Sequence, residues 1–128
     1  MAGRETNENM KNFIISLIKK KLTNHKINFL KDKIVFAGLT YKKNVSDLRN
    51  SHALKIFKYF LSRSQRVYGS DPFIKNRYKL IDFRSLHKDK KIKCIVLLVE
   101  HDVFKSILKK INKKIHIINL FNFYEKKK

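Results

Sequence analysis

The sequence has no apolar run that approaches the roughly 20 residues that a membrane span needs. Its N-terminus also lacks the charged-then-apolar layout of a secretory signal peptide, so we expect a cytoplasmic protein with no membrane partner. Neither internal repeats nor low-complexity domains are present. For 128 residues we therefore expect one folding unit, and 43% apolar composition with ten Phe is enough to build its core.

Cysteine and glycine are scarce, with one and three residues respectively. Cys94 lies inside the apolar run of residues 94–99, which predicts a buried small hydrophobic residue rather than a nucleophile or metal ligand. The dinucleotide-binding pattern G-x-G-x-x-G is absent, because only Gly38 stands where three glycines would be needed. Nothing in the sequence therefore supports a nicotinamide cofactor on this domain.

Acidic residues are also few: 10 Asp and Glu stand against 31 Lys and Arg, which gives a net charge of +21. A basic surface attracts nucleic acid, anionic lipid and phosphorylated ligands alike. The lysines are scattered along every segment instead of forming one block with interleaved aromatics, which favours a general abundance of lysine over a dedicated interface. A basic nucleic-acid-binding α/β module remains an alternative function, although we do not expect nucleic acid as the partner.

Helical and strand patterns alternate along the chain. Met10, Phe13, Ile14, Leu17, Ile18 and Leu22 repeat at helical spacing in the first segment. Strand patterns then cover residues 33–38, 65–69, 93–99 and 115–120, and helical patterns cover residues 51–63, 82–87 and 102–111, the last with Asp102 as cap. This alternation predicts a three-layer α/β/α Rossmann-like domain with a mainly parallel sheet, preceded by an N-terminal helix. Right-handed crossovers predict the strand order 2-1-3-4.

One long loop, residues 38–51 (GLTYKKNVSDLRNS), joins the first strand to the next helix. Gly38 ends the strand, which we interpret as a tight turn that also leaves room for a ligand. Loops at the carboxyl ends of parallel strands bind ligands, and helix N-termini there favour anions. The predicted strand order brings this loop together with residues 100–102, so we expect a binding site at this edge.

Four segments, in order, resemble a known family. They are residues 2–10 (AGRETNENM), the loop 38–51, residues 68–72 (YGSDP) and residues 100–104 (EHDVF). Their patterns are similar to those of the nucleotide-sugar dehydrogenases, the group that acts on UDP-glucose, UDP-N-acetylhexosamines and GDP-mannose. The likeness lies in the C-terminal, nucleotide-sugar-binding domain and spans nearly the whole chain. Residues 2–4 and 47–51 look most like the UDP-N-acetylhexosamine branch.

The resemblance implies that the chain has two parts and that catalysis takes place outside it. Residues 1–24 would be the tail of a connecting helix and residues 25–128 the nucleotide-sugar-binding domain, so the chain would start inside a longer protein. In this family the catalytic cysteine and the NAD site lie in the missing N-terminal half, which would be the main partner, and a homodimer is a further partner. The chain would then bind a UDP-sugar without itself oxidising the C6 alcohol to a carboxylate for polysaccharide synthesis.

The resemblance also suggests ligand contacts within the loop. Tyr41 and Lys42 stand where the family has an aromatic–lysine pair that contacts the nucleotide sugar. Asp47 and Arg49 match the family's spacing and either contact the ligand or form an internal ion pair that fixes the loop. One departure matters: where some members carry D-G-R-[RN] after the last strand, residues 119–122 read NLFN, with Phe121 in place of the arginine. A domain that keeps the fold and has lost the ligand is therefore a further alternative.

Two other ionisable residues invite chemical interpretations. We interpret Asp71 mainly as a turn former before Pro72. His101 lies between two carboxylates, Glu100 and Asp102, but metal sites need three or four ligands at suitable spacing, and nothing else supports proton transfer. We therefore expect neither a catalytic residue nor a metal site in this chain.

Overall fold

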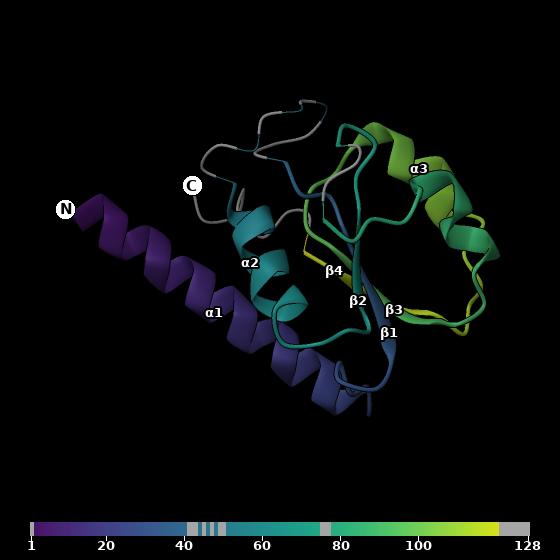
Figure 1. The fold of residues 1–128 in the computed structure, drawn as a ribbon, viewed down its shortest axis with the longest axis horizontal. Helices are drawn as coiled ribbons and strands as arrows, with labels where there is room; N and C mark the ends of the chain where they lie inside the picture. Colours follow the sequence, from purple (N-terminus) through teal and green to yellow (C-terminus); the bar gives the residue numbers. More distant parts are fainter. Residues whose placement is uncertain are drawn as a thin grey trace.

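Helices and strands alternate along the chain in the order that the sequence predicts (Figure 1). The computed structural model describes residues 2–40, 44, 46, 48, 51–74 and 78–120, with the backbone alone for residues 2–8. The helices are α1 (Ala2–Asn24), α2 (His52–Leu61), the 3₁₀ helix η1 (Phe83–Lys88) and α3 (Asp102–Leu108). The strands are β1 (Lys33–Ala37), β2 (Val67–Ser70), β3 (Ile92–Leu97) and β4 (His116–Asn119).

Within the described residues the strands form one sheet in the order β2-β1-β3-β4, and every neighbouring pair is parallel. The predicted order is therefore confirmed. At its carboxyl end β1 pairs on both sides, because Ala37 lies opposite Ser70 of β2 and Leu97 of β3. The loops that leave β1, β2 and β3 consequently start side by side.

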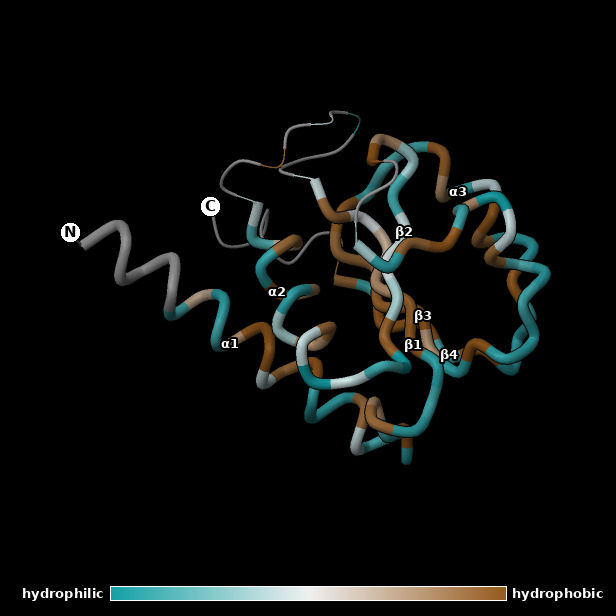
Figure 2. The backbone as a smooth tube through the Cα atoms, in the orientation of Figure 1, coloured by the Kyte–Doolittle hydropathy of each residue, from teal (hydrophilic) through white to brown (hydrophobic). Residues whose placement is uncertain are grey.

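Alternate residues of β1 pack on opposite faces of the sheet, as the two-residue period of a strand requires. Ile34 and Phe36 belong to a hydrophobic cluster shared with α1 and α2, whereas Val35 and Ala37 belong to a second cluster shared with η1 and α3. Figure 2 shows the hydrophobic strands enclosed between these two layers of helices. The three-layer α/β/α architecture is therefore confirmed.

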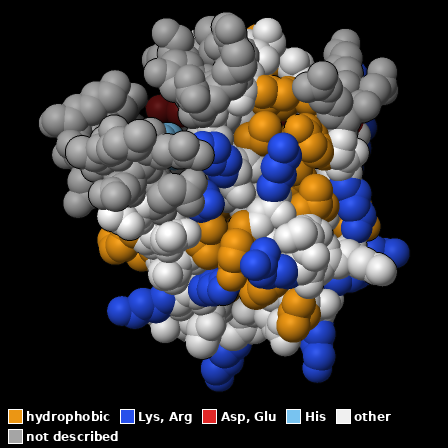
Figure 3. Space-filling model, turned by 60° about the vertical axis from the view of Figure 1, so that its left-hand side comes forward, with side chains coloured by type: hydrophobic (Ala, Val, Ile, Leu, Met, Phe, Trp, Pro, Cys, Tyr) orange, Lys and Arg blue, Asp and Glu red, His pale blue; other side chains and the backbone are white. Residues whose placement is uncertain are grey.

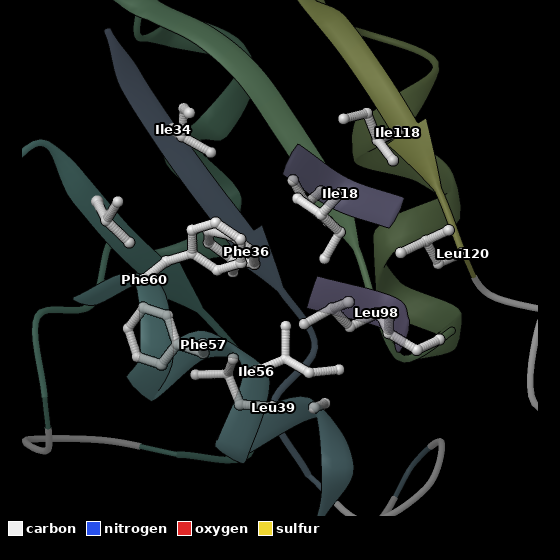
Figure 4. Packing of buried hydrophobic residues seen from close by; sticks show 14 of the residues in the cluster. Ile18, Ile34, Phe36, Leu39, Ile56, Phe57, Phe60, Leu98, Ile118 and Leu120 are labelled. Carbon is white, nitrogen blue, oxygen red and sulfur yellow. The ribbon is translucent and has the colours of Figure 1, made fainter. Parts of the chain in front are cut away.

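The cluster on the α1 and α2 side is built around aromatic rings (Figure 4). Phe36 and Phe60 stack with their centroids 5.0 Å apart, and Phe29 meets Phe60 edge-on at 5.1 Å. Phe57 is as fully buried as Phe36 and Phe60, with 0% exposure. We call Phe29, Phe36, Phe57 and Phe60 the aromatic core. Burial of each of the three fully buried rings stabilises the fold by about 1.5–3 kcal/mol, and Phe29, which is partly buried, contributes less.

The long helix α1 differs in one residue from the expected stripe. Ile14, Ile18 and Leu22 are buried as predicted, but Phe13 is 52% exposed and Ile15 is buried instead. The segment carries apolar residues on more than one face, so periodicity alone could not decide which neighbour meets the sheet. In Figure 1 the N-terminal part of α1 extends beyond α2. Among the described helices, α1 included, none has the length and apolar character of a membrane span.

The turn after β3 corrects two predicted boundaries. β3 ends at Leu97 instead of Val99, because the chain turns after Leu98 N–H has donated to the carbonyl oxygen of Ala37. α3 begins at Asp102, so His101 and not Asp102 occupies the cap position, and the His101 side chain makes no capping hydrogen bond.

Gly38 is required by this same turn. Its φ of +90° lies in the left-handed region that favours glycine. A Cβ atom at this position would lie 2.5 Å from the carbonyl oxygen and 2.6 Å from the nitrogen of Val99. The expected tight turn is confirmed. The expectation that Gly38 leaves room for a ligand is wrong, because the backbone of Val99 fills that room.

Candidate functional site

Buried polar side chains gather at one edge of the sheet. In the described part of the chain, the buried polar or charged residues are Thr40, Ser51, Ser70, Asp71 and His101. Thr40 and Ser51 belong to the loop after β1, Ser70 and Asp71 lie at and just beyond the end of β2, and His101 follows β3. This is the carboxyl edge of the sheet, where α/β proteins bind their ligands.

The carboxylate of Asp71 is fully buried and accepts hydrogen bonds on both oxygens. Its Oδ2 accepts from the backbone N–H of Leu39 at 2.7 Å and lies 2.9 Å from His101 Nε2. Its Oδ1 accepts from the backbone N–H of Phe73 at 2.8 Å. The last contact confirms the expected turn, and the other two fasten the ends of three strands to one another. A buried carboxylate needs such donors to offset its lost hydration.

The imidazole of His101 is fully buried, and its contacts determine where its proton lies. The backbone N–H of Asn44 can only donate, and it does so to His101 Nδ1 at 2.8 Å. Nδ1 therefore carries a lone pair, and the ring proton lies on Nε2, which faces Asp71 Oδ2 and Thr40 Oγ1 at 2.9 and 3.0 Å. These contacts hold the ring as the neutral Nε2–H tautomer.

Asn44 joins the two loops that the strand order brings together. In addition to its backbone contact with His101, its Nδ2 donates to Asp102 Oδ2 at 2.9 Å. Its Oδ1 accepts from the backbone N–H of Asp102 at 3.1 Å. The predicted convergence of residues 38–51 with residues 100–102 is therefore confirmed. We call Thr40, Asn44, Asp71 and His101 the polar edge cluster.

The far end of the loop is fixed by Ser51, the N-cap of α2. Its hydroxyl donates to the carbonyl oxygen of Leu39 at 2.7 Å and accepts from the backbone N–H of Leu54 at 3.0 Å. The side chain thus satisfies a free donor of the first helical turn and ties that turn to the end of β1. The loop is therefore held at its start by Leu39, in its middle by Asn44 and at its end by Ser51.

The four ligand contacts suggested by the sequence lie outside the described residues. They are Tyr41, Lys42, Asp47 and Arg49, and Phe121 also lies outside. The structure therefore describes the frame of the loop, and the roles of these side chains stay predictions.

The contacts of His101 with Asp71 and with Thr40 were not predicted from the sequence. A usable signal was present, because each of these polar residues follows closely on an apolar strand. Among the described residues no group of three or more His, Cys, Asp or Glu side chains could hold a metal ion.

Cys94 lies in β3 and is fully buried. Burial raises the pKa of its thiol to about 12, so the reactive thiolate is not formed near neutral pH. The prediction of a buried, unreactive cysteine is confirmed.

Comparison with known proteins gives one family. Residues 35–126 match the UDP binding domain of the UDP-glucose/GDP-mannose dehydrogenase family. The UDP-N-acetyl-D-mannosamine dehydrogenase of Methanococcus maripaludis is 34% identical over 111 residues, which cover 84% of this chain and 25% of the relative. The UDP-N-acetyl-D-glucosamine 6-dehydrogenase of Salmonella typhi is 28% identical over 115 residues, which cover 84% of this chain and 26% of the relative.

A solved structure shares the fold. The UDP-D-ManNAc dehydrogenase of Pyrococcus horikoshii superposes with a TM-score of 0.67 at 26% identity, over 93% of this chain and 28% of that one. The chain thus spans about a quarter of the length of the curated relatives it matches.

Proposed function

The chain belongs to the UDP-glucose/GDP-mannose dehydrogenase family, as its UDP binding domain, and on that premise we propose that residues 38–51 bind the uridine diphosphate of a UDP-sugar. The observation that carries the proposal is the position of the loop's described ends. Thr40 and Ser51 lie at the carboxyl edge of the parallel sheet, and Ser51 opens a helix whose N-terminus favours an anion.

Within this loop we assign roles by chemistry. Tyr41 contacts the uracil through its ring or its backbone, and Lys42 contacts a phosphate or the sugar. Arg49 makes a forked contact with phosphate, or it pairs with Asp47 and holds the loop.

The whole enzyme, on this proposal, is an NAD-dependent UDP-N-acetylhexosamine dehydrogenase that oxidises the C6 alcohol to a carboxylate. Relatives of this chain carry the names of such dehydrogenases, and the chain spans a quarter of their length. Residues 1–24 are then the end of the helix that connects to the catalytic half, and the assembled enzyme is a homodimer.

NAD does not fit the described residues of this chain. A dinucleotide site needs several glycines after the first strand, so that the backbone can approach the pyrophosphate. Here Gly38 alone stands at that position, and the space beside it is occupied by Val99. We therefore assign the cofactor, like the catalytic cysteine, to the half of the enzyme outside this chain.

Calorimetric titration of the chain tests the proposal. UDP, a UDP-N-acetylhexosamine, UDP-glucose and GDP-mannose are titrated in turn, and we expect saturable binding of the uridine ligands. Lys42→Ala should raise the dissociation constant for UDP about tenfold, because a charge-assisted hydrogen bond is lost. Lys20→Ala, on the exposed side of α1, is the matched control and should leave the dissociation constant unchanged.

The other outcomes identify the alternatives. On the face that Figure 3 shows, Lys and Arg side chains are spread over the surface instead of forming one stripe. Binding of nucleic acid with a steep loss of affinity in salt and indifference to UDP would nevertheless favour the basic module. Absence of binding to every ligand would indicate a domain that has kept the fold and lost the site.

A further inference from the structure

One buried imidazole contacts the chain on both sides of the tripeptide 41–43. Thr40 precedes the tripeptide, and its Oγ1 lies 3.0 Å from His101 Nε2. Asn44 follows the tripeptide, and its N–H donates to His101 Nδ1 at 2.8 Å. The two residues that flank the tripeptide are therefore both in contact with a single ring. A segment whose ends are already fixed has less conformational freedom to lose when it binds a ligand.

The orientation of the His101 ring is itself fixed by its surroundings. Asp71 holds the Nε2 side, and Asp71 is in turn held by the backbone N–H groups of Leu39 and Phe73. The rings of Phe73 and Phe104 lie beside the imidazole, with centroids at 4.8 and 5.7 Å. Rotation of the imidazole would break hydrogen bonds in a fully buried place, so the ring connects the loop rigidly to the sheet.

The backbone of Asn44 is in the left-handed region, with a φ of +60°, which asparagine adopts more readily than most residues with a side chain. Two residues that follow β3 stabilise this conformation. His101 accepts a hydrogen bond from the Asn44 N–H, and Asp102 forms two hydrogen bonds with the Asn44 side chain.

We propose that His101 is a positioning residue for the nucleotide-binding loop: it fixes Thr40 and Asn44, which flank the tripeptide 41–43 in the sequence, before the ligand arrives. The role rests on the proposed function of residues 38–51. His101 acts through the chain and does not itself contact the UDP-sugar.

Two substitutions of His101 separate its contacts, because each keeps a polar atom near one ring nitrogen. Glutamine can bring its amide to the Nε2 position and keep the contact with Asp71, but it offers Asn44 no acceptor. Asparagine places its oxygen near the Nδ1 position and keeps that acceptor, but it does not reach Asp71. In calorimetric titrations of the full chain with UDP, we expect the dissociation constant to rise about tenfold more for His101→Gln than for His101→Asn.

Ile34→Val controls for a loss of affinity that only reflects lower stability. Ile34 is fully buried near the amino end of β1, at the opposite end of the strand from the polar edge cluster. The variant should lower the free energy of unfolding and leave the dissociation constant for UDP unchanged. A merely structural role for His101 would instead make affinity follow stability through all three variants.

The unaltered chain offers a direct test of the central hydrogen bond. An N–H···N bond transmits a ¹⁵N–¹⁵N coupling, so nuclear magnetic resonance should show a coupling between the Asn44 amide and His101 Nδ1. The ¹⁵N shift of Nδ1 should be that of an unprotonated ring nitrogen. Absence of the coupling, or a proton on Nδ1, would overturn the proposal whatever UDP does.

The titrations also distinguish the two proposals from each other. If the unaltered chain binds UDP and His101→Gln binds it equally well, the positioning role is wrong and the proposed function stands. Equal weakening by His101→Gln and His101→Asn also overturns the positioning role. If the unaltered chain does not bind UDP, the proposed function fails, and the positioning role for a UDP-sugar fails with it even where the coupling is present.

Discussion

Most side chains of the aromatic core and of the polar edge cluster are buried, with Phe29 partly buried and Asn44 exposed, but the two groups are held together by different forces. In the aromatic core, Phe36 and Phe60 stack at 5.0 Å and contribute through the apolar area that they remove from water. In the polar edge cluster, Asp71 and His101 lose their hydration and regain hydrogen bonds of fixed direction. The first arrangement gives much stability and tolerates small shifts, whereas the second gives little net stability and fixes atoms in place.

The difference shows in which part of the molecule directed hydrogen bonds fix the side chains. Within the described residues, the buried polar side chains lie at the carboxyl edge, and the clusters on the two faces of the sheet are apolar. Stability alone would be served better by apolar side chains at the edge as well. The polar edge cluster is therefore best explained by the loop that it holds.

Phe60→Ala should have the largest effect on stability and tests the aromatic core. Removal of the ring leaves a cavity between α2 and the sheet, so we expect a loss of about 3–5 kcal/mol in the free energy of unfolding. Denaturant titration measures it. Phe13→Ala is the matched control, because Phe13 is 52% exposed, and its loss should stay within about 0.5 kcal/mol. Equal losses for the two variants would contradict this description of the core.

Asp71→Asn should have an intermediate effect and tests the polar edge cluster. The amide group of the variant faces the N–H groups of Leu39 and Phe73 with one oxygen and one NH₂ group, so one of these backbone donors loses its acceptor. We therefore expect the free energy of unfolding to fall by about 2 kcal/mol. Asp32→Asn is the control, because the Asp32 carboxylate accepts an exposed hydrogen bond from Asn28 N–H. If Asp71→Asn matched Asp32→Asn, the cluster would not be the tight assembly described above.

Mild acid should have the smallest effect and tests a third place, where the end of α1 meets β4. The ring centroids of His25 and His116 lie 3.6 Å apart. Burial, together with the charges of His25 and Lys21, lowers the pKa of His116 below its ordinary value of 6.5. The unfolded chain then binds the proton more readily than the folded chain, so this contribution to stability is complete above pH 6.5 and is lost as the pH falls below it.

Melting temperatures between pH 7.5 and 5.5 measure this loss. His116→Gln should flatten the dependence of the melting temperature on pH, because the group with the lowered pKa is removed. An unchanged slope in His116→Gln would show that the loss of stability does not arise at His116.

Much of the fold could be predicted from the sequence, because its signals are local. The apolar runs of β1 and β3 and the stripe of α2 follow from periodicity, and strand order follows from the handedness of crossovers. The exchange of Phe13 for Ile15 shows the limit of periodicity, which cannot choose between neighbours in a broad apolar stripe.

The candidate site could be predicted only in part. The loop after β1 and its convergence with residues 100–102 follow from topology. The contacts of His101 with Asp71 and Thr40 do not, because they join residues far apart in the sequence through the directions of single hydrogen bonds. The roles of Tyr41, Lys42, Asp47 and Arg49 stay predictions, of which the titration of Lys42→Ala tests one.

The parallel sheet also determines the order in which the chain can fold. Among the described strands of this sheet, β1 is synthesised first, yet each of its neighbours follows only after a crossover connection, and pairing between such distant segments makes folding slow. His101 comes after β3, so the polar edge cluster closes only when Ile92–Leu97 has paired with Lys33–Ala37. The loop that we propose as the ligand site is thus synthesised early and acquires its support late, when the third strand reaches the first.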